Sequence, residues 1–411
     1  MYNLINSTLD EIAFFNPPEH LKKGREAKKI PMGFLQTFNR KILGYEWSEY
    51  SSGPKFRNGD TLVAKITPCL ENGKTAFVDI LDNEELAFGS SEFIVLRPRT
   101  EADTMFLYYL SISPTFRKRA ISCMEGTSGR KRVNENTLKY FDFLIPKPES
   151  RLRIAEVLST LDKKIELNNK INAELEAMAK LIYDYWFVQF DFPDANGKPY
   201  KSSGGKMVYN ESIKREIPDG WEVKALGKTV KTSLGGTPST KKSEYWDNAD
   251  IPWLNSGEVA NFPALGSEAK ITQTGVDSSA AEILPSGSVI ISIVRHLRVS
   301  ILAINAAFNQ SVVGLYETDT LKNSFLYPYL CRELPRLMSL RTGAQQPHIN
   351  KGIVDASLLV IPSSEILKTY YNSTDSIFEK INVAAMENVK LSELRDWLLP
   401  MLMNGQVTVN T

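Results

Sequence analysis

The sequence predicts an α+β protein with two tandem globular α/β domains, separated by two long antiparallel helices that form a coiled-coil spacer. Three observations lead to this prediction: the chain repeats itself once, each copy contains strand-like runs, and each copy ends in a long amphipathic helix. Strands grouped apart from long helices are typical of α+β proteins. The prediction therefore rests first on the repeat.

The two copies lie 216 positions apart over their second halves. Leu144-Ile145-Pro146 closes an apolar run in the first copy, and Val360-Ile361-Pro362 closes one in the second. Two long copies indicate a duplicated domain rather than a solenoid; the alternative is chance agreement among common residues. Further pairs keep this offset or drift from it as loops change length: Asn134 with Asn350, Leu161 with Ile377 and Leu175 with Leu391 at 216, and Gly59 with Gly287 at 228.

Each copy begins with a mixed region rich in Gly, Pro and β-branched residues. Residues 60–66 and 288–294 are short apolar runs bounded by turn residues, so we expect them to be strands. A long helix then follows in each copy. The first starts after Pro148, near Ser150 as a good N-cap.

The two helices carry apolar stripes at spacings of three and four. A helix of about 35 residues is roughly 50 Å long, too long for one small domain to cover. We therefore expect the two to pack on each other, with Asn168 as a polar residue that fixes their register; the alternative is that each packs only on its own domain. We expect Pro400 to kink the last turn of the second helix and Gly405 to end it. The predicted stripes are Ile154, Val157, Leu158, Leu161, Ile165, Ile171, Leu175, Met178, Ile182 and Tyr185 in the first copy, and Tyr370, Ile377, Ile381, Ala384, Leu391, Leu394, Leu398 and Met401 in the second.

This pattern predicts five segments. They are a first domain over 1–148, a long helix over 149–190, a turn-rich polar linker over 191–216, a second domain over 217–362 and a second long helix over 363–405.

Composition is that of a soluble globular protein: 411 residues, 42% hydrophobic and 24% charged, with a net charge of +1. Three cysteines far apart favour reduced thiols in the cytoplasm over a disulfide framework. No secretory signal or bilayer-length apolar run is visible, so no membrane partner is expected. A net charge near zero means that any nucleic-acid-binding surface must be a local cluster of cations.

Four fragments resemble catalytic or metal-binding signatures, and each lacks an essential part. Asn16-Pro17-Pro18-Glu19 resembles the adenine-methyltransferase turn, but Glu19 replaces the aromatic residue that stacks on the base; an irregular loop is the alternative. Gly73-Lys74-Thr75 resembles the end of a phosphate-binding loop whose first glycine is missing. Residues 218–224 place an acid too close to a Glu-x-Lys run for a nuclease site, and three histidines are too scattered for a metal. We predict no catalytic residue and no metal site.

Polar and basic side chains cluster in the loop before each long helix. Arg can bond guanine and Gln or Asn can bond adenine in the major groove, while Lys and Arg neutralise phosphates. The same location with different chemistry suits two domains that read different sequences; ordinary solvated loops are the alternative. The candidates are Arg130, Lys131 and Arg132 in the first copy, and Gln345, Gln346, His348 and Lys351 in the second.

Two further groups of candidates follow strands or turns. The first group comes directly after the predicted strands, and the second occupies a Gly-Gly-Thr-Pro turn whose glycines permit close approach to phosphate. They are Lys65 and Thr67 with Arg295, His296 and Arg298, and then Thr237, Ser239 and Lys241.

In these segments the chain resembles the specificity subunits of type I restriction–modification enzymes over nearly its whole length. The ordered set of motifs carries the resemblance, since no single string is specific. The first copy lacks a clear Gly-Trp-Glu opening and the Gly-Gly-Thr-Pro turn. The matching strings are Leu161–Asn168, Tyr185-Trp186-Phe187, Ile217-Pro218-Asp219-Gly220-Trp221-Glu222, Gly235-Gly236-Thr237-Pro238-Ser239, Tyr245-Trp246, Ile251-Pro252-Trp253-Leu254 and Gln346-Pro347-His348-Ile349-Asn350.

The resemblance implies two target-recognition domains, each of which binds half of an interrupted double-stranded DNA target. It also implies that the long helices set the unread gap, which is the number of base pairs between the two halves that neither domain reads. It implies methyltransferase subunits, usually two, which use S-adenosylmethionine, and restriction (motor-nuclease) subunits, which use ATP and Mg. This chain itself would need no cofactor. Two other functions stay open: a stand-alone DNA methyltransferase or nuclease, and a coiled-coil adaptor that binds only proteins.

Overall fold

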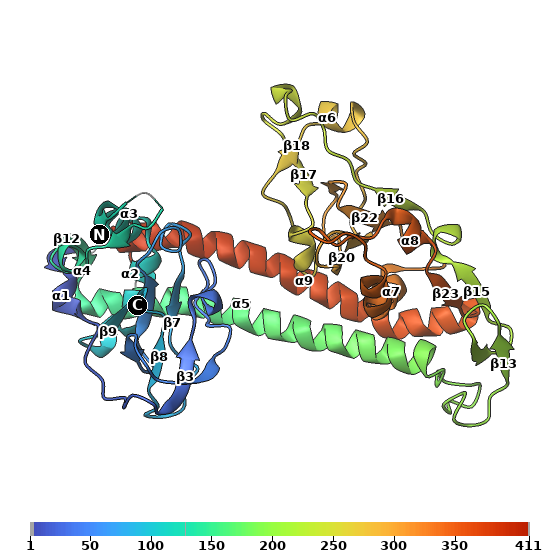
Figure 1. Ribbon diagram of the computed structural model, residues 1–411, viewed down its shortest axis with the longest axis horizontal. Coiled ribbons are helices and arrows are strands. Elements are labelled where there is room, and N and C mark those ends of the chain that lie inside the picture. Colours follow the sequence, from blue (N-terminus) through green and yellow to red (C-terminus); the bar gives the residue numbers. More distant parts are fainter. Residues whose placement is uncertain (1–3, 128, 410–411) are drawn as a thin grey trace. The chain divides into compact units, whose positions relative to one another are not determined.

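The computed structural model describes residues 4–127 and 129–409 (Figure 1). Ser128 of the first basic loop and the N-terminal Met1-Tyr2-Asn3 lie outside these residues. The chain divides into two compact units, one of residues up to 166 together with those from 388 onward, the other of residues 167–387. Both divisions fall inside a long helix.

Among its described residues, the first unit contains two four-stranded sheets and two pairs of strands, β1–β12 and β10–β11. The sheets have the orders β2-β9-β6-β7 and β4-β3-β8-β5, and β1 pairs antiparallel with β12. Strands β6 and β9 are buried on both faces because α2 covers one side and the second sheet's apolar residues lie on the other. The elements are β1 (Leu4–Thr8), α1 (Leu9–Ile12), β2 (Ala13–Phe15), β3 (Glu26–Ile30), β4 (Glu46–Glu49), β5 (Lys55–Phe56), β6 (Thr61–Ala64), β7 (Thr75–Phe77), β8 (Ala87–Gly89), β9 (Phe93–Pro98), α2 (Thr104–Ile112), α3 (Pro114–Ser122), β10 (Met124–Glu125), β11 (Arg132–Val133), α4 (Glu135–Lys139) and β12 (Asp142–Pro146).

The second unit repeats this plan. Its main sheet has the order β16-β22-β19-β20, and β15 pairs antiparallel with β23 as β1 does with β12. A hairpin, β13–β14, lies within the predicted linker and the start of the second copy. The elements are β13 (Met207–Asn210), β14 (Arg215–Pro218), β15 (Glu222–Ala225), β16 (Thr232–Leu234), β17 (Ile251–Leu254), β18 (Lys270–Ile271), α6 (Gln273–Asp277), β19 (Val289–Ser292), β20 (Val299–Ile301), β21 (Ala307–Phe308), β22 (Val312–Leu315), α7 (Asn323–Ser339), α8 (Lys351–Asp355) and β23 (Leu358–Ile361).

Two helices far longer than the rest complete the chain, α5 (Pro148–Tyr183) and α9 (Ser364–Met403), drawn green and red in Figure 1. Helix α5 begins two residues before the predicted Ser150, because proline suits a first helical turn that needs no N–H. It continues into a π-helical turn over Asp184–Val188. Helix α9 runs through Pro400, and Gly405 adopts a left-handed φ of 74° just beyond its end. The predicted fold class, α+β with tandem domains and two long helices, is confirmed.

The helices contact each other within each unit. In the second unit the Asn168 amide donates to Glu387 Oε2 at 2.7 Å and Asn172 donates to the Ile381 carbonyl at 3.3 Å. Residue numbers rise along α5 as they fall along α9, so the pair is antiparallel there. In the first unit Arg395 of α9 donates to Asp162 of α5 at 2.9 Å.

Each helix also contributes apolar residues to both cores. The core of the first unit includes Ile154 and Leu158 from α5 together with Leu399 and Leu402 from α9. The core of the second unit includes residues from the opposite helix ends, among them Ala179 and Tyr183 of α5 and Tyr370, Ile377 and Ile381 of α9. The alternative that each helix packs only on its own domain is therefore wrong.

The predicted apolar stripe of α5 is correct at Leu175 and Ile182, which pack against the core of the second unit, and wrong at Ile171 and Met178, which are 39% and 49% exposed. Asn168 is buried, as expected of a polar residue between the helices, and so is Asn172. The interface turned toward α9 thus carries amides, which are satisfied in part by Glu387 and a backbone carbonyl. Leu394 of α9 is likewise exposed. An apolar repeat alone cannot tell which of two faces meets the partner helix.

Candidate nucleic-acid interface

In the first unit the end of β6 meets the β10–β11 hairpin, so two groups of predicted residues come together. The backbone N–H of Thr67 donates to the Lys131 carbonyl at 3.0 Å, and that of Val133 donates to the Lys65 carbonyl at 2.9 Å. The hairpin is short, and its tip includes Gly126 and Gly129 at positive φ. Two groups of predicted residues therefore lie side by side at the end of β6, namely Lys65 and Thr67 with Lys131 and Arg132.

The second unit makes the same contacts with different side chains. The N–H of Arg295 donates to the Pro347 carbonyl at 2.7 Å, and that of Ile349 donates to the Ile293 carbonyl at 2.9 Å. Arg295 corresponds to Thr67 at the offset of 228, and Pro347 corresponds to Lys131 at 216. The duplication has thus kept two main-chain contacts and changed the side chains around them.

Ion pairs hold two of the first unit's cations in place. Arg132 donates to both carboxylate oxygens of Glu92, at 2.7 and 2.9 Å, and this hydrogen bond lowers the pKa of Glu92. Lys65 Nζ lies 2.8 Å from Glu135 Oε1. Arg130 and Lys131 are exposed and have no ion pair among the described residues. They are the cations of this group that are free to meet an anion.

In the second unit the backbone at Arg295 is unusual and is held by a residue that the sequence reasoning missed. Arg295 has φ of 59°, a left-handed conformation that is uncommon without glycine. Arg341 Nη1 donates to the Arg295 carbonyl at 2.8 Å, so that it fixes this turn. Ser292 holds the other side, because its hydroxyl donates to the His296 carbonyl and accepts from the Arg298 N–H. A lone arginine at the end of a helix gave no sequence signal for this role.

The remaining predicted residues of the second unit's loop differ in whether their side chains are exposed or paired with other residues. Gln345 and Gln346 are exposed, and the Gln346 carbonyl lies 3.0 Å from His348 Nδ1. Lys351 instead pairs with Asp355 one turn further along α8, at 2.7 Å. The loop with these amides and His348 thus contacts Arg295 through the Pro347 carbonyl, while Lys351 pairs within its own helix.

The Gly-Gly-Thr-Pro turn adjoins this group. A Cβ on Gly235 would lie 2.2 Å from the Asn309 carbonyl oxygen, so only glycine fits there. The Thr237 hydroxyl donates to the side-chain oxygen of Gln310. The carbonyl of Ser311, the residue after Gln310, accepts from the N–H of Ile293 at 2.9 Å, which connects the turn to the end of β19. Side chains of this turn that face solvent include those of Thr237, Ser239 and Lys241.

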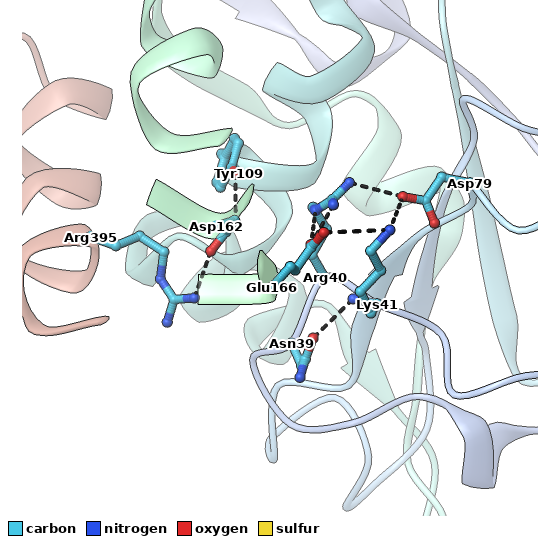
Figure 2. Close-up of polar contacts among 8 residues, drawn as sticks. All are labelled: Asn39, Arg40, Lys41, Asp79, Tyr109, Asp162, Glu166 and Arg395. Atoms are coloured by element: carbon cyan, nitrogen blue, oxygen red, sulfur yellow. Dashed lines mark hydrogen bonds and ion pairs between the residues drawn. The ribbon is translucent and has the colours of Figure 1, made fainter. Parts of the chain in front are cut away.

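A polar network fastens the first unit's sheets to α5 (Figure 2). Arg40 and Lys41 converge on Asp79 and Glu166; Arg40 Nη1 lies 3.0 Å and Lys41 Nζ 2.6 Å from the Asp79 carboxylate. One turn earlier on α5, Asp162 accepts from the Tyr109 hydroxyl at 2.6 Å. Burial, with the Asp162 charge, raises the pKa of Tyr109, which therefore stays a hydrogen-bond donor. The sheets of the first unit are thus held to α5 by charged hydrogen bonds.

The fragments that resembled catalytic signatures occupy loops and turns, except that the Glu-x-Lys run lies in β15. Gly73 has φ of 72° in the turn before β7, and Lys74 donates to the Met32 carbonyl. Lys224 pairs with Glu222, its neighbour in β15. Within residues 4–127 and 129–409 there is no group of three His, Cys, Asp or Glu side chains placed to hold a metal ion. The same residues contain no helix long and apolar enough to cross a bilayer.

Comparison with known proteins places these features in a family. The family described as "Type I restriction modification DNA specificity domain" matches residues 7–177 and again residues 218–387. The type I restriction enzyme HindI specificity subunit of Haemophilus influenzae is 27% identical, over 90% of this chain and 92% of the relative. The MjaIX specificity subunit of Methanocaldococcus jannaschii is also 27% identical, over 76% and 71% of the respective chains.

A solved structure agrees in fold. The crystal structure of the type I restriction–modification system S subunit from M. genitalium aligns with 98% of this chain and 96% of its own, at a TM-score of 0.54 and 14% identity. The two family matches correspond to the two copies of the internal repeat. The chain therefore belongs to the type I restriction–modification DNA specificity family, with two tandem specificity domains.

Proposed function

We propose that this chain catalyses nothing and serves as the DNA-reading subunit of a cytoplasmic type I restriction–modification complex, with each domain reading half of a bipartite target. The observation that carries the proposal is the main-chain contact made twice: Thr67 to Lys131 in one unit and Arg295 to Pro347 in the other. A shared framework presents Arg and Lys in the first copy, and Gln and His in the second. Arg suits guanine and Gln suits adenine, so the two domains read different sequences.

Any S-adenosylmethionine, ATP and Mg chemistry belongs to partner subunits in this proposal. The lysines of two fragments that resemble catalytic signatures bond within the fold, Lys74 to the Met32 carbonyl and Lys224 to Glu222. A stand-alone methyltransferase or nuclease would modify or cut DNA without added subunits. An adaptor that binds only proteins would not retain DNA in a sequence-dependent way.

Removing base-reading side chains from one domain is expected to relax one half-site only. In the variant Gln346→Ala/His348→Ala we expect the second domain's half of the target to become degenerate, since removing a base-specific hydrogen bond costs about 1–3 kcal/mol. The measurement is sequencing of methylated adenines in cells that express the chain with its methyltransferase. Arg130→Ala/Lys131→Ala is expected to affect only the other half.

The matched control is Gln273→Ala, which removes an exposed amide that bonds to Asp277 in α6. It should leave the methylated sequence unchanged. Degeneracy in both halves after either double variant would contradict the division of labour between domains.

The long helices also support a proposal for the methyltransferase subunits. Each helix exposes apolar residues on one face. They are Leu167, Ile171, Met178 and Leu181 on α5, and Val383, Met386, Leu394 and Trp397 on α9. The offset of 216 relates Leu167 to Val383, Met178 to Leu394 and Leu181 to Trp397. Exposed apolar stripes of this kind are typical of protein-binding surfaces. Two equivalent stripes favour two docked methyltransferase subunits, and restriction subunits would join that complex.

A charge placed on one stripe is expected to remove one methyltransferase subunit. Leu181 is 67% and Trp397 55% exposed, so glutamate at either position costs the fold little but places a charge in the docking surface. We expect Leu181→Glu and Trp397→Glu each to reduce the number of bound subunits from two to one, as counted by native mass spectrometry. Met338→Glu, on the exposed side of α7, is the control and should keep both. Two subunits bound to either stripe variant would contradict docking there.

A further inference from the structure

The loop over residues 16–25 of the first unit is the structural counterpart of the Gly-Gly-Thr-Pro turn. Strand β2 pairs with β9 as β16 pairs with β22, and the residue after each edge strand continues the pairing. The N–H of Asn16 donates to the Val95 carbonyl at 2.8 Å, and that of Gly235 donates to the Val312 carbonyl at 3.1 Å. The Asn-Pro-Pro-Glu string, which the sequence suggested only as a failed catalytic motif, therefore begins the loop that the first copy was expected to lack.

This loop starts at the candidate interface. The Asn16 side chain donates to Glu135 Oε2 at 2.6 Å, and the other oxygen of that carboxylate receives Lys65 at 2.8 Å. The Asn16 side-chain oxygen also accepts from the N–H of Val95 at 2.9 Å. One carboxylate thus joins the base of the loop to a residue already predicted to contact DNA.

Both ends of the loop are fixed by the fold. Near its start Glu19 pairs with Arg97, which also binds buried Asp60, and Lys55 donates to the Glu19 carbonyl at 2.6 Å. At its end the N–H of Gly24 donates to the Tyr50 carbonyl at 2.9 Å. The segment between these anchors is short, so its conformation is set before any ligand binds, which lowers the entropy cost of binding.

The segment between the anchors presents unpaired positive charge. Lys22 and Lys23 are exposed and make no ion pair with any residue that the structure describes. Arg25 differs, because it shares a hollow of about 250 Å³ with Glu26, Glu84 and Glu85, whose charges oppose an anion there. In the second copy the corresponding turn carries exposed Lys241. The positive charge of the loop is therefore concentrated at Lys22 and Lys23.

We propose that Lys22 and Lys23 bind DNA phosphates beside the half-site that the first domain reads. This inference rests on the proposed function and adds a contact surface to it. Ammonium groups on a preorganised loop supply affinity and fix register on the duplex, but they carry no sequence information. The lysines position the first domain, and Arg130 and Lys131 at the neighbouring hairpin meet the bases.

The test measures the affinity of the chain, assembled with its methyltransferase subunits, for a duplex carrying the target at several salt concentrations. For Lys22→Gln/Lys23→Gln we expect the slope of log K against log salt to become shallower by about 2, since each phosphate that a lysine neutralises contributes about 0.9 to that slope. Affinity for unrelated duplex should fall by the same factor, and the methylated sequence should stay as it is. Lys201→Gln/Lys214→Gln removes two exposed lysines from the linker region and is the charge-matched control.

A salt slope equal to that of the control would overturn the proposal, and so would a changed methylated sequence, which would make these residues base contacts. Both results are distinguishable from failure of the proposed function, since in that case the unaltered complex would show no sequence-dependent binding. The double variant should unfold at the same midpoint temperature as the unaltered chain, which verifies that the loop substitutions leave the fold intact.

Discussion

Replacing Asp162 with alanine is expected to lower the free energy of unfolding by about 3 kcal/mol, within the range for breaking a buried ion pair. The Asp162 side chain is only 6% exposed, and it accepts from both Tyr109 and Arg395. Its removal leaves the buried Tyr109 hydroxyl without its acceptor and takes the buried carboxylate from the mostly buried Arg395 guanidinium, which keeps its pair with Asp396. Chemical denaturation of the isolated chain, followed by circular dichroism, measures the change.

The chain offers a matched control on the same arginine. Arg395 also pairs with Asp396, at 2.8 Å, but that carboxylate is 65% exposed. Removing an exposed partner costs about 0–1 kcal/mol, so Asp396→Ala should be nearly neutral. Tyr109→Phe removes one hydrogen bond to a charged group and should cost about 1.5–3 kcal/mol. Equal destabilisation by Asp162→Ala and Asp396→Ala would show that burial does not govern this network.

Lengthening both long helices by one heptad is expected to widen the unread gap of the DNA target by about three base pairs. Seven residues add roughly 10 Å to a helix, and B-DNA rises about 3.4 Å per base pair. The insertions belong after Asn169 in α5 and after Ala385 in α9, because the contacts of Asn168 and Asn172 place these points opposite each other in the second unit. A heptad returns nearly the same helical face, so the neighbouring contacts are kept.

Sequencing of methylated adenines reports both parts of that target. The two half-sites should stay the same while the number of unread base pairs rises. A heptad inserted in α5 alone is the control, since it shifts the register of one helix against the other and should impair folding. An unchanged gap with altered half-sites would contradict a measuring role for the helices.

The fold could be predicted from the sequence because equivalent residues of the two copies lie at constant offsets. The offset of 216 correctly joined the strand ends and the long helices, and the offset of 228 correctly related the ends of β6 and β19. Contacts that depend on long-range partners could not be predicted in the same way. Nothing near Arg132 or Lys65 in the sequence indicates that Glu92 and Glu135 hold them.

The face of α5 that meets α9 was predicted only in part, for a similar reason. In its second half apolar residues lie on both faces, since Leu175 and Ile182 pack against the second unit's core whereas Ile171 and Met178 are exposed. Asn168 and Asn172 are buried because α9 supplies Glu387 and a carbonyl from a segment some 210 residues away. The similarity of the loop over 16–25 to the Gly-Gly-Thr-Pro turn could not be predicted from its Asn-Pro-Pro-Glu string. It depends on the pairing of β2, the strand before the loop, with β9.

The sharing of both cores by both helices has a consequence for how the protein unfolds. Melting of either core frees one end of α5 and one end of α9, and those helices also supply Ile154 and Leu402 to one core and Tyr183 and Tyr370 to the other. Because each helix is continuous from one core to the other, we expect the loss of one core to destabilise the helix ends that pack in the other. Heating should give a single cooperative transition, and a chain cut within residues 191–216, which belong to the second unit, should be tolerated better than a cut in either long helix.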